Sequence, residues 1–230
     1  MSPNSQSYHK LAIAYILPYA AYVTIASLLS GLDPGINYTI RIGVVGAILI
    51  WGWRRYVPLR GPGNWIVSVV AGIIFGLLGI LLWIALLFPF VTSGEAAGDN
   101  FSFGMRILAS TLLVPIFEEL LMRVYVFRLV HHWYMERKIK KDNAFNRVFH
   151  TKSLNDFKPG DWSFFAIIFS SIIFALGHQV VEWPAAFAYG LLMAFLWVWR
   201  KDVLTCVMAH ATTNLTLGLY VYLTGSWQYW

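Results

Sequence analysis

The chain has 230 residues, of which 58% are hydrophobic and only 12% are charged. Soluble domains carry about 25% charged residues, so this composition excludes an ordinary soluble domain. The 17 Lys and Arg exceed the 11 Asp and Glu and give a net charge of +6. Membrane proteins collect basic residues in their cytoplasmic loops, so this excess indicates no nucleic-acid partner. We expect one integral membrane domain over residues 1–230, in contact with the lipid bilayer.

Seven apolar runs approach or exceed the roughly 20 helical residues that span about 30 Å of hydrocarbon. In chain order they cover residues 11–30, 38–53, 65–90, 106–130, 162–178, 184–199 and 203–223. The second run is short and contains Arg41, so we expect it to begin at the membrane interface. The pattern predicts an all-α, polytopic membrane bundle of about seven transmembrane helices.

Loop charges support this count. Basic residues dominate after the second run, in residues 131–161 and after the sixth run, and the intervening loops carry acids: Asp33, Glu95, Asp99 and Glu182. This alternation predicts a cytoplasmic N-terminus and a C-terminus on the other side. The basic segment 131–161 is expected to be cytoplasmic and partly an amphipathic surface helix. Four histidines outside the predicted motifs are expected to be solvated: His9, His131, His132 and His150.

Polar side chains interrupt three of the later runs. The fourth run carries Glu118, Glu119 and Arg123, the fifth ends in His178, and the seventh carries His210 and Asn214. An ionisable side chain inside a span costs on the order of 2.5–3.5 kcal/mol, so these groups must face the bundle interior or a wet cavity. Any one of them could be structural, as a helix-binding ion pair or an interfacial histidine. Their presence on three separate runs favours a functional site.

The spacing within each run suggests an arrangement. Glu119 and Arg123 are four residues apart and can pair on one helix face, whereas Glu118 lies about 100° further round the helix. One carboxylate is then neutralised and the other is free to act as a base. The pairs Phe174 with His178 and His210 with Asn214 repeat the four-residue spacing.

Three ordered motifs resemble those of the CPBP family, also called Abi, which contains CAAX-prenyl proteases and bacteriocin-processing enzymes. They are Glu118-Glu119-x-x-x-Arg123, Phe174-x-x-x-His178 and His210-x-x-x-Asn214. The C-terminal region from His210 to Trp230 most resembles the CAAX-protease-related members associated with bacterial exosortase systems. The resemblance implies an intramembrane endopeptidase of the bacterial inner membrane, acting on a membrane-associated and possibly lipidated peptide or protein.

The resemblance also implies a role for each motif residue. Glu118 would be the general base, His178 would orient the attacking water, and His210 with Asn214 would stabilise the oxyanion. Glu119 and Arg123 would hold the helix and tune Glu118, with Phe174 in support. Positioned proton acceptors and preorganised donors in a low-dielectric cavity suit this chemistry.

Metal dependence and rival functions stay open at this point. Glu118, His178 and His210 could hold a zinc ion, although the sequence lacks a His-Glu-x-x-His helix and asparagine is an unusual zinc ligand. The resemblance, more than these two features, implies metal-free glutamate chemistry. One rival is a non-catalytic membrane immunity or scaffold protein that keeps the residues structurally. Another is a proton-coupled transporter. All the buried polar motifs follow residue 100, which argues against a transporter built from two matched halves.

The predicted boundaries place the motifs at different depths. At 1.5 Å per residue, His178 lies about 24 Å from Trp162, while His210 lies about 10 Å from Val203. The motifs can meet only if the fifth span starts outside the membrane, tilts strongly, or has other boundaries.

Overall fold

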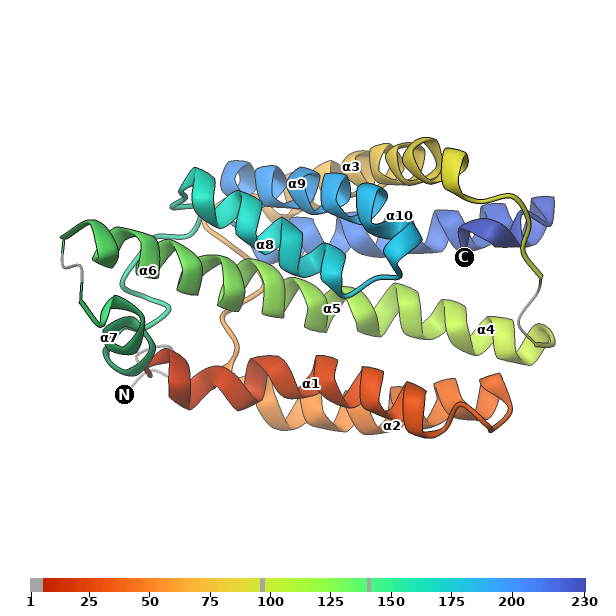
Figure 1. Ribbon diagram of the computed structural model, residues 1–230, viewed down its shortest axis with the longest axis horizontal. Coiled ribbons are helices and arrows are strands. Elements are labelled where there is room, and N and C mark those ends of the chain that lie inside the picture. Colours follow the sequence, from red (N-terminus) through yellow and green to blue (C-terminus); the bar gives the residue numbers. More distant parts are fainter. Residues whose placement is uncertain (1–5, 96–97, 140–141) are drawn as a thin grey trace.

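The apolar runs form long helices because a helix satisfies its own backbone hydrogen bonds where water is absent. The computed structural model describes residues 6–95, 98–139 and 142–230, and Figure 1 shows its long helices running roughly along one axis. The first part comprises α1 (Tyr8–Leu28), α2 (Pro34–Gly52) and α3 (Trp65–Leu87). The last part comprises α8 (Phe164–Leu176), α9 (Trp183–Arg200) and α10 (Val203–Thr224). Within the described ranges there is no β-strand, as the all-α prediction requires.

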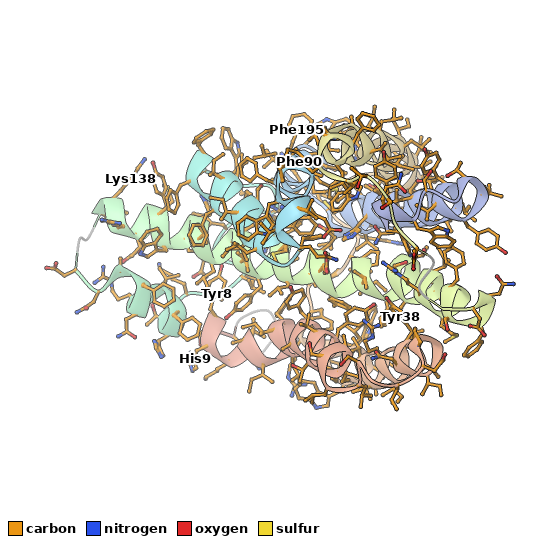
Figure 2. All side chains as sticks on the ribbon, turned by 45° about the vertical axis from the view of Figure 1, so that its right-hand side comes forward. Tyr8, His9, Tyr38, Phe90, Lys138 and Phe195 are labelled. Carbon is orange, nitrogen blue, oxygen red and sulfur yellow. The ribbon has the colours of Figure 1, made fainter. Side chains whose placement is uncertain are left out.

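One continuous helical rod crosses the middle of the bundle (Figure 1). It consists of α4 (Asn100–Leu108), a π-helical segment (Ala109–Leu113), α5 (Val114–Glu119), a second π-helical segment (Leu120–Val126) and α6 (Phe127–Ile139). Forty residues at 1.5 Å each extend about 60 Å, twice the hydrocarbon thickness, so the rod must project from the membrane. Its basic end, where Lys138 projects (Figure 2), is followed by the short amphipathic α7 (Ala144–Thr151). Lys140 and Lys141 of the predicted basic segment lie outside the described residues.

Four helical stretches in the described chain are long and apolar enough to cross a membrane. They are Tyr8–Leu28, Pro34–Arg55, Trp65–Phe90 and Val180–Arg200. The rod, the 13-residue α8 and α10 are not among them, and these three carry the polar motifs. The count of seven crossings therefore stays a prediction. The second helix begins at Pro34, four residues earlier than expected, so Arg41 lies well inside it.

Helices α3 and α10 pack closely because glycines line the contact. A Cβ added at Gly76 would lie 2.6 Å from the carbonyl oxygen of Ala209 and 2.5 Å from Cβ of Thr212. Gly72 meets Met208 equally closely. Small residues four apart let membrane helices approach in this way. The hydroxyl of Thr213 donates to the carbonyl of Gly76 at 2.9 Å, which joins the two helices directly.

Gly76→Ala is expected to destabilise the protein by about 1–3 kcal/mol relative to Gly46→Ala, because the new methyl would overlap backbone that cannot move aside. A Cβ at Gly46 meets nothing within 4 Å, and both changes add the same helix propensity. Thermal unfolding of the two variants in detergent measures the difference. Equal melting temperatures would show that this helix contact tolerates expansion.

The predicted solvation of His131 and His132 is wrong, since both side chains are buried. His132 stacks on Phe157, with ring centroids 4.1 Å apart, and its Nδ1 lies 2.6 Å from the hydroxyl of Tyr8. Tyr8 lies at the start of α1, close to the rod (Figure 2). Residues 152–161 fold back over α6 and exclude water, which the local polarity of this segment did not reveal.

Burial lowers the pKa of His132 from 6.5 to about 4, against the opposing charge of Asp156, and with smaller lowering effects from His131, Lys152 and Arg128. Between these two pH values the unfolded chain binds more protons than the folded chain, so the free energy of unfolding falls as pH falls. The expected loss from pH 6.5 to pH 4 is about 3 kcal/mol. Burial lowers the pKa of His131 as well, which adds to the same loss.

Melting temperatures between pH 7 and pH 4.5 test this expectation. His132→Gln is expected to weaken the dependence of the melting temperature on pH. His150→Gln serves as the matched control, because His150 is exposed. An unchanged pH profile in His132→Gln would contradict the assignment.

The predicted boundaries placed His178 and His210 at different depths in the membrane, and the position at which α8 begins resolves this conflict. Phe165 stacks on Tyr134, with ring centroids 5.8 Å apart, near the basic end of the rod. Val203, at the start of α10, instead shares a cavity with Arg128. Tyr134 lies six residues, or about 9 Å, further along the rod than Arg128. Helix α8 therefore starts further out than α10, and its C-terminal end reaches the level of Glu118.

Candidate active site

The rod is distorted on both sides of the two glutamates. Pro115 has no N–H to donate to the carbonyl four residues earlier and its ring crowds that carbonyl, so a regular α-helix cannot continue through it. The chain adopts a π-helical segment over Ala109–Leu113, and a second one begins directly after Glu119. Such π-helical turns are frequent at functional sites because they re-aim side chains.

Glu119 is fully buried and paired. Its Oε2 accepts from Nε of Arg123 at 3.0 Å, as the four-residue spacing predicts, and both side chains are 0% exposed. Arg123 also donates to the carbonyl of Gly190 on α9 at 3.4 Å. The ion pair therefore ties the rod to α9 and neutralises one of the two adjacent carboxylates.

His210 lies between the two glutamates. Its Nδ1 is 2.9 Å from Oε1 of Glu119, and its Nε2 is 3.9 Å from Oε2 of Glu118. Glu118 has no hydrogen-bond partner as close as this among the described residues, and its side chain is 14% exposed toward the cavity. Tyr189 and Phe174 flank the imidazole, with ring centroids 5.8 and 6.1 Å away. When His210 is protonated, the net charge of the four buried groups is zero. These groups are Glu118, Glu119, Arg123 and His210.

His178 reaches the site from the end of α8. Its Nδ1 lies 2.9 Å from the carbonyl of Phe174, and because a carbonyl only accepts, Nδ1 is assigned as the protonated nitrogen. In the neutral ring Nε2 is then a free acceptor. The rings of Phe174 and Trp83 hold the imidazole at centroid distances of 4.7 and 5.6 Å.

Asn214 lies one turn beyond His210 on α10. Its Nδ2 donates to the carbonyl of Ser110 at 2.8 Å, within the first π-helical segment. The distortion of the rod thus exposes a carbonyl that positions the asparagine. A carboxamide nitrogen carries two hydrogens, so one remains available to a further acceptor.

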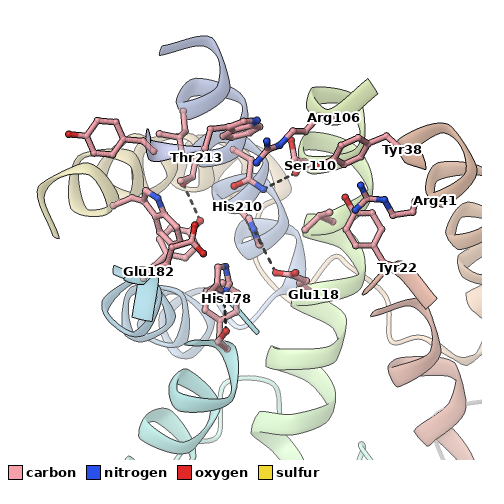
Figure 3. A pocket seen from close by; sticks show the side chains of 18 residues that line it. Tyr22, Tyr38, Arg41, Arg106, Ser110, Glu118, His178, Glu182, His210 and Thr213 are labelled. Carbon is pink, nitrogen blue, oxygen red and sulfur yellow. Dashed lines mark hydrogen bonds and ion pairs between the residues drawn. The ribbon is translucent and has the colours of Figure 1, made fainter. Parts of the chain in front are cut away.

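These side chains line one cavity of about 240 Å³ (Figure 3). The structure brings together Glu118, Phe174, His178, His210 and Asn214 at its wall, with Glu119 and Arg123 directly behind. The motif analysis did not select several other residues of the cavity wall, which include Tyr22, Tyr38, Arg41, Trp83, Arg106, Ser110, Glu182, Tyr189 and Trp230. Among these, the charged residues Arg41, Arg106 and Glu182 carried a usable signal, because they lie in or beside apolar runs. Aromatic residues are common in every span and carried none.

The part of the chain that the structure describes contains no group of three or more His, Cys, Asp or Glu side chains placed to hold a metal ion. The arrangement offers instead a carboxylate with few partners, an imidazole beside it, and a second imidazole with a free acceptor. These are the parts that acid–base activation of a water molecule needs.

Comparison with protein families matches residues 100–216, just over half of the chain, to the type II CAAX prenyl endopeptidase Rce1-like family. Comparisons with curated proteins and with solved structures give no match. The matched range contains every motif residue, and the narrower resemblance to exosortase-associated members stays a prediction. With its apolar helices and its match across the rod, α8, α9 and most of α10, the chain belongs to the Rce1-like family of type II CAAX prenyl endopeptidases, a family of membrane proteases.

Proposed function

We propose that this protein is an intramembrane endopeptidase that hydrolyses a peptide bond of a membrane-associated peptide or protein with water activated by Glu118. One observation carries the proposal. Glu118 has no close partner among the described residues and faces His210 and His178 in a cavity, while the adjacent Glu119 is neutralised by Arg123. If these charges served only to hold helices together, the Glu119–Arg123 pair would be enough, and the carboxylate of Glu118 would only add a desolvation cost.

In the proposed first step, Glu118 takes a proton from a water molecule that Nε2 of His178 orients. The oxygen of this water bonds to the scissile carbonyl carbon, and the π electrons of the carbonyl move onto its oxygen. Negative charge thereby passes from Glu118 to the new oxyanion. Protonated His210 donates to this oxyanion through Nε2–H, and Asn214 donates through its second amide hydrogen.

In the second step, Glu118 returns its proton to the amide nitrogen as the carbon–nitrogen bond breaks. The products are a new carboxyl group and a new amine, and Glu118 is again a carboxylate. Glu119 and Arg123 take no part in proton transfer. Glu119 holds His210 in the orientation and protonation state that the oxyanion needs, as an acidic partner does for a catalytic histidine.

We further propose that no metal ion takes part. The geometry of the described residues supports this, because it brings no three His, Cys, Asp or Glu side chains into the arrangement that a metal ion needs. The purified protein in vesicles is expected to keep its cleavage rate after treatment with a strong chelator. A rate that falls on chelation and returns with added zinc would replace this mechanism with metal-assisted hydrolysis.

The experiment that tests the function compares membranes carrying the wild type or Glu118→Gln at matched expression, by sequencing newly formed peptide N-termini. Ends found only with the wild type would identify substrates, which are then tested with purified protein, with and without a prenyl group. Identical ends in both samples, with the biological function preserved, would instead support a non-catalytic membrane partner.

A further inference from the structure

A second cavity, of about 480 Å³, lies beside the rod on the side of Glu118 that leads to α7. Arg128 of the rod and Trp197 of α9 contribute to its wall, and Arg128 follows Glu118 by ten residues, or about 15 Å. Three loops that are distant in sequence complete the wall, within residues 57–62, 155–159 and 201–203. The first of them links α2 to α3 and crosses from one layer of helices to the other in Figure 1. No step of the proposed reaction uses a residue of this wall.

Close backbone contacts fix the loops to one another. The N–H of Leu204 donates to the carbonyl of Leu59 at 2.9 Å. A Cβ added at Gly61 would lie 2.5 Å from the carbonyl oxygen of Lys201. Gly160, whose φ is +83°, packs equally closely on the side chain of Lys201. These contacts hold the three loops around one cavity.

Arg128 is the most deeply buried positive charge of this wall. It is 6% exposed, and its guanidinium lies 5.2 Å from the ring centroid of Trp197. Its Nη1 donates to the carbonyl of Leu154 at 2.7 Å, whereas its buried Nε has no hydrogen-bond partner among the described residues. The buried indole N–H of Trp197 likewise has no partner there. No carboxylate of the described chain forms an ion pair with Arg128.

The rim of the cavity is also positive. Three further cations lie exposed around it: Arg60, Lys158 and Lys201. Asp202 is the acid in this wall, and the protein's own donors surround it. Its Oδ1 accepts from the N–H and the hydroxyl of Thr205 at 2.7 and 2.6 Å, and its Oδ2 accepts from the hydroxyl of Ser68 at 2.7 Å. Among the described residues the wall therefore carries four cations and no carboxylate that pairs with them.

A structural role for Arg128 does not account for this charge. The hydrogen bond to Leu154 uses one nitrogen of the guanidinium, and a neutral donor could supply it. A buried cation without an ion-pair partner is costly unless an anion completes the site. Guanidinium and ammonium groups bind phosphate well, and an indole N–H can add a further hydrogen bond. The cavity therefore has the chemistry of a phosphate site.

The surroundings of the cavity favour the phosphate of a lipid over a soluble phosphate. Exposed tryptophans flank all three loops in the sequence, as is typical of the headgroup level of a bilayer: Trp53, Trp65, Trp162 and Trp199. A neighbouring groove of about 460 Å³ shares Val57 and Pro58 with the cavity. Its other wall residues include the apolar side chains of Trp53, Tyr56, Leu59 and Leu120. An acyl chain can fill this groove, whereas a soluble phosphate makes no use of it.

We propose that Arg128 and the cationic rim bind the phosphate of an anionic phospholipid, with one acyl chain in the groove beside Val57 and Pro58. The lipid supplies the negative charge that the protein does not provide for Arg128. It also bridges the connections α2–α3, α7–α8 and α9–α10, and so stabilises their arrangement. A zwitterionic choline headgroup binds less well, because its quaternary ammonium is repelled by the same rim.

Native mass spectrometry of the purified protein in detergent tests the proposal, because it counts bound lipids and gives their dissociation constants. The wild type is expected to bind one phosphatidylglycerol at least about 10-fold more tightly than phosphatidylcholine with the same chains. Arg128→Gln is expected to reduce this ratio to below about 3. Arg137→Gln is the matched control, because Arg137 is exposed on the same helix α6 and does not line the cavity. It should keep the wild-type ratio.

The double variant Arg60→Gln with Lys158→Gln covers the case in which Arg128→Gln fails to fold. Both side chains are exposed, so the double variant should fold and still lose most of the preference for phosphatidylglycerol. Equal binding of the two lipids by the wild type would overturn the proposal. Equal losses in Arg137→Gln and in the cavity variants would also overturn it, because they would show a diffuse attraction to the basic surface.

Glycerophosphoglycerol, the headgroup of phosphatidylglycerol without its acyl chains, separates the two sources of phosphate. Phosphatidylglycerol is expected to raise the melting temperature of the wild type, whereas the same concentration of glycerophosphoglycerol should leave it unchanged. Equal stabilisation by both would assign the cavity to a soluble phosphate and overturn the lipid site. None of these measurements requires cleavage of a peptide, so their outcome is independent of the proposed endopeptidase function.

Discussion

Glu118→Gln is expected to lower the rate of peptide cleavage by at least about 10³-fold while the protein stays folded. Glutamine preserves the shape of the side chain but cannot take a proton from water, and a positioned general base contributes about 10²- to 10⁴-fold. In the proposed mechanism the same group also returns the proton to the leaving amine, so both steps of the reaction are expected to fail. The measurement is kcat/KM for a purified substrate in vesicles, with melting temperature recorded on the same sample.

Stability should not explain the loss. Glu118 is largely buried and has no close partner of its own in the described chain, so its charge carries a desolvation cost, and removing that charge is expected to hold or raise the melting temperature. Glu95→Gln is the matched control, because Glu95 is exposed in a loop and its change should leave the rate within about twofold. Retention of wild-type activity in Glu118→Gln would remove the carboxylate from the mechanism.

Arg123→Ala is expected to destabilise the protein by about 3–5 kcal/mol and to abolish cleavage. The change leaves the carboxylate of Glu119 buried without its arginine, and breaking a buried pair from one side has costs of this size. It also removes the contact to the carbonyl of Gly190 that ties the rod to α9. Thermal and denaturant unfolding in detergent measure the loss of stability.

The double variant Glu119→Gln with Arg123→Met separates structure from chemistry. It removes both charges together, so much of the stability is expected to return, whereas activity is not, because His210 still lacks its acidic partner. Glu136→Gln is the surface control, since it breaks the partly exposed pair with Arg147 and should change stability by no more than about 1 kcal/mol. Full activity in the double variant would show that Glu119 has only a structural role.

The two adjacent carboxylates of the site have different surroundings. Burying two carboxylates side by side in an apolar bundle is costly, and the structure offsets this cost more fully for Glu119 than for Glu118. Glu119 pairs with Arg123 and His210, while Glu118 has, among the residues that the structure describes, only the more distant Nε2 of the same histidine. The pairing that stabilises one carboxylate therefore leaves the other without a close partner at the cavity wall, as the proposed general base requires.

Local periodicity in the sequence is enough to determine the fold class and part of the site. Apolar runs of spanning length, with few charges, allow little but an all-helical membrane bundle, because only a helix satisfies its backbone within one segment. The four-residue spacing of Glu119 and Arg123 placed them on one helix face, and the ion pair is present. The order of the three motifs, which resembles a known family, agrees with the family match.

Relations between helices were decided only by the tertiary structure, because spacing within one helix says nothing about its register against another. The outward start of α8 brings His178 level with Glu118, and packing against α9 and α6 sets that register. The fold of residues 152–161 over α6 buries His131 and His132, although their own neighbours in the sequence are polar. Arg41 looked like an interfacial charge because its cavity is built from helices distant in sequence. Chain periodicity specifies which face of a helix is apolar, and packing alone specifies what that face meets.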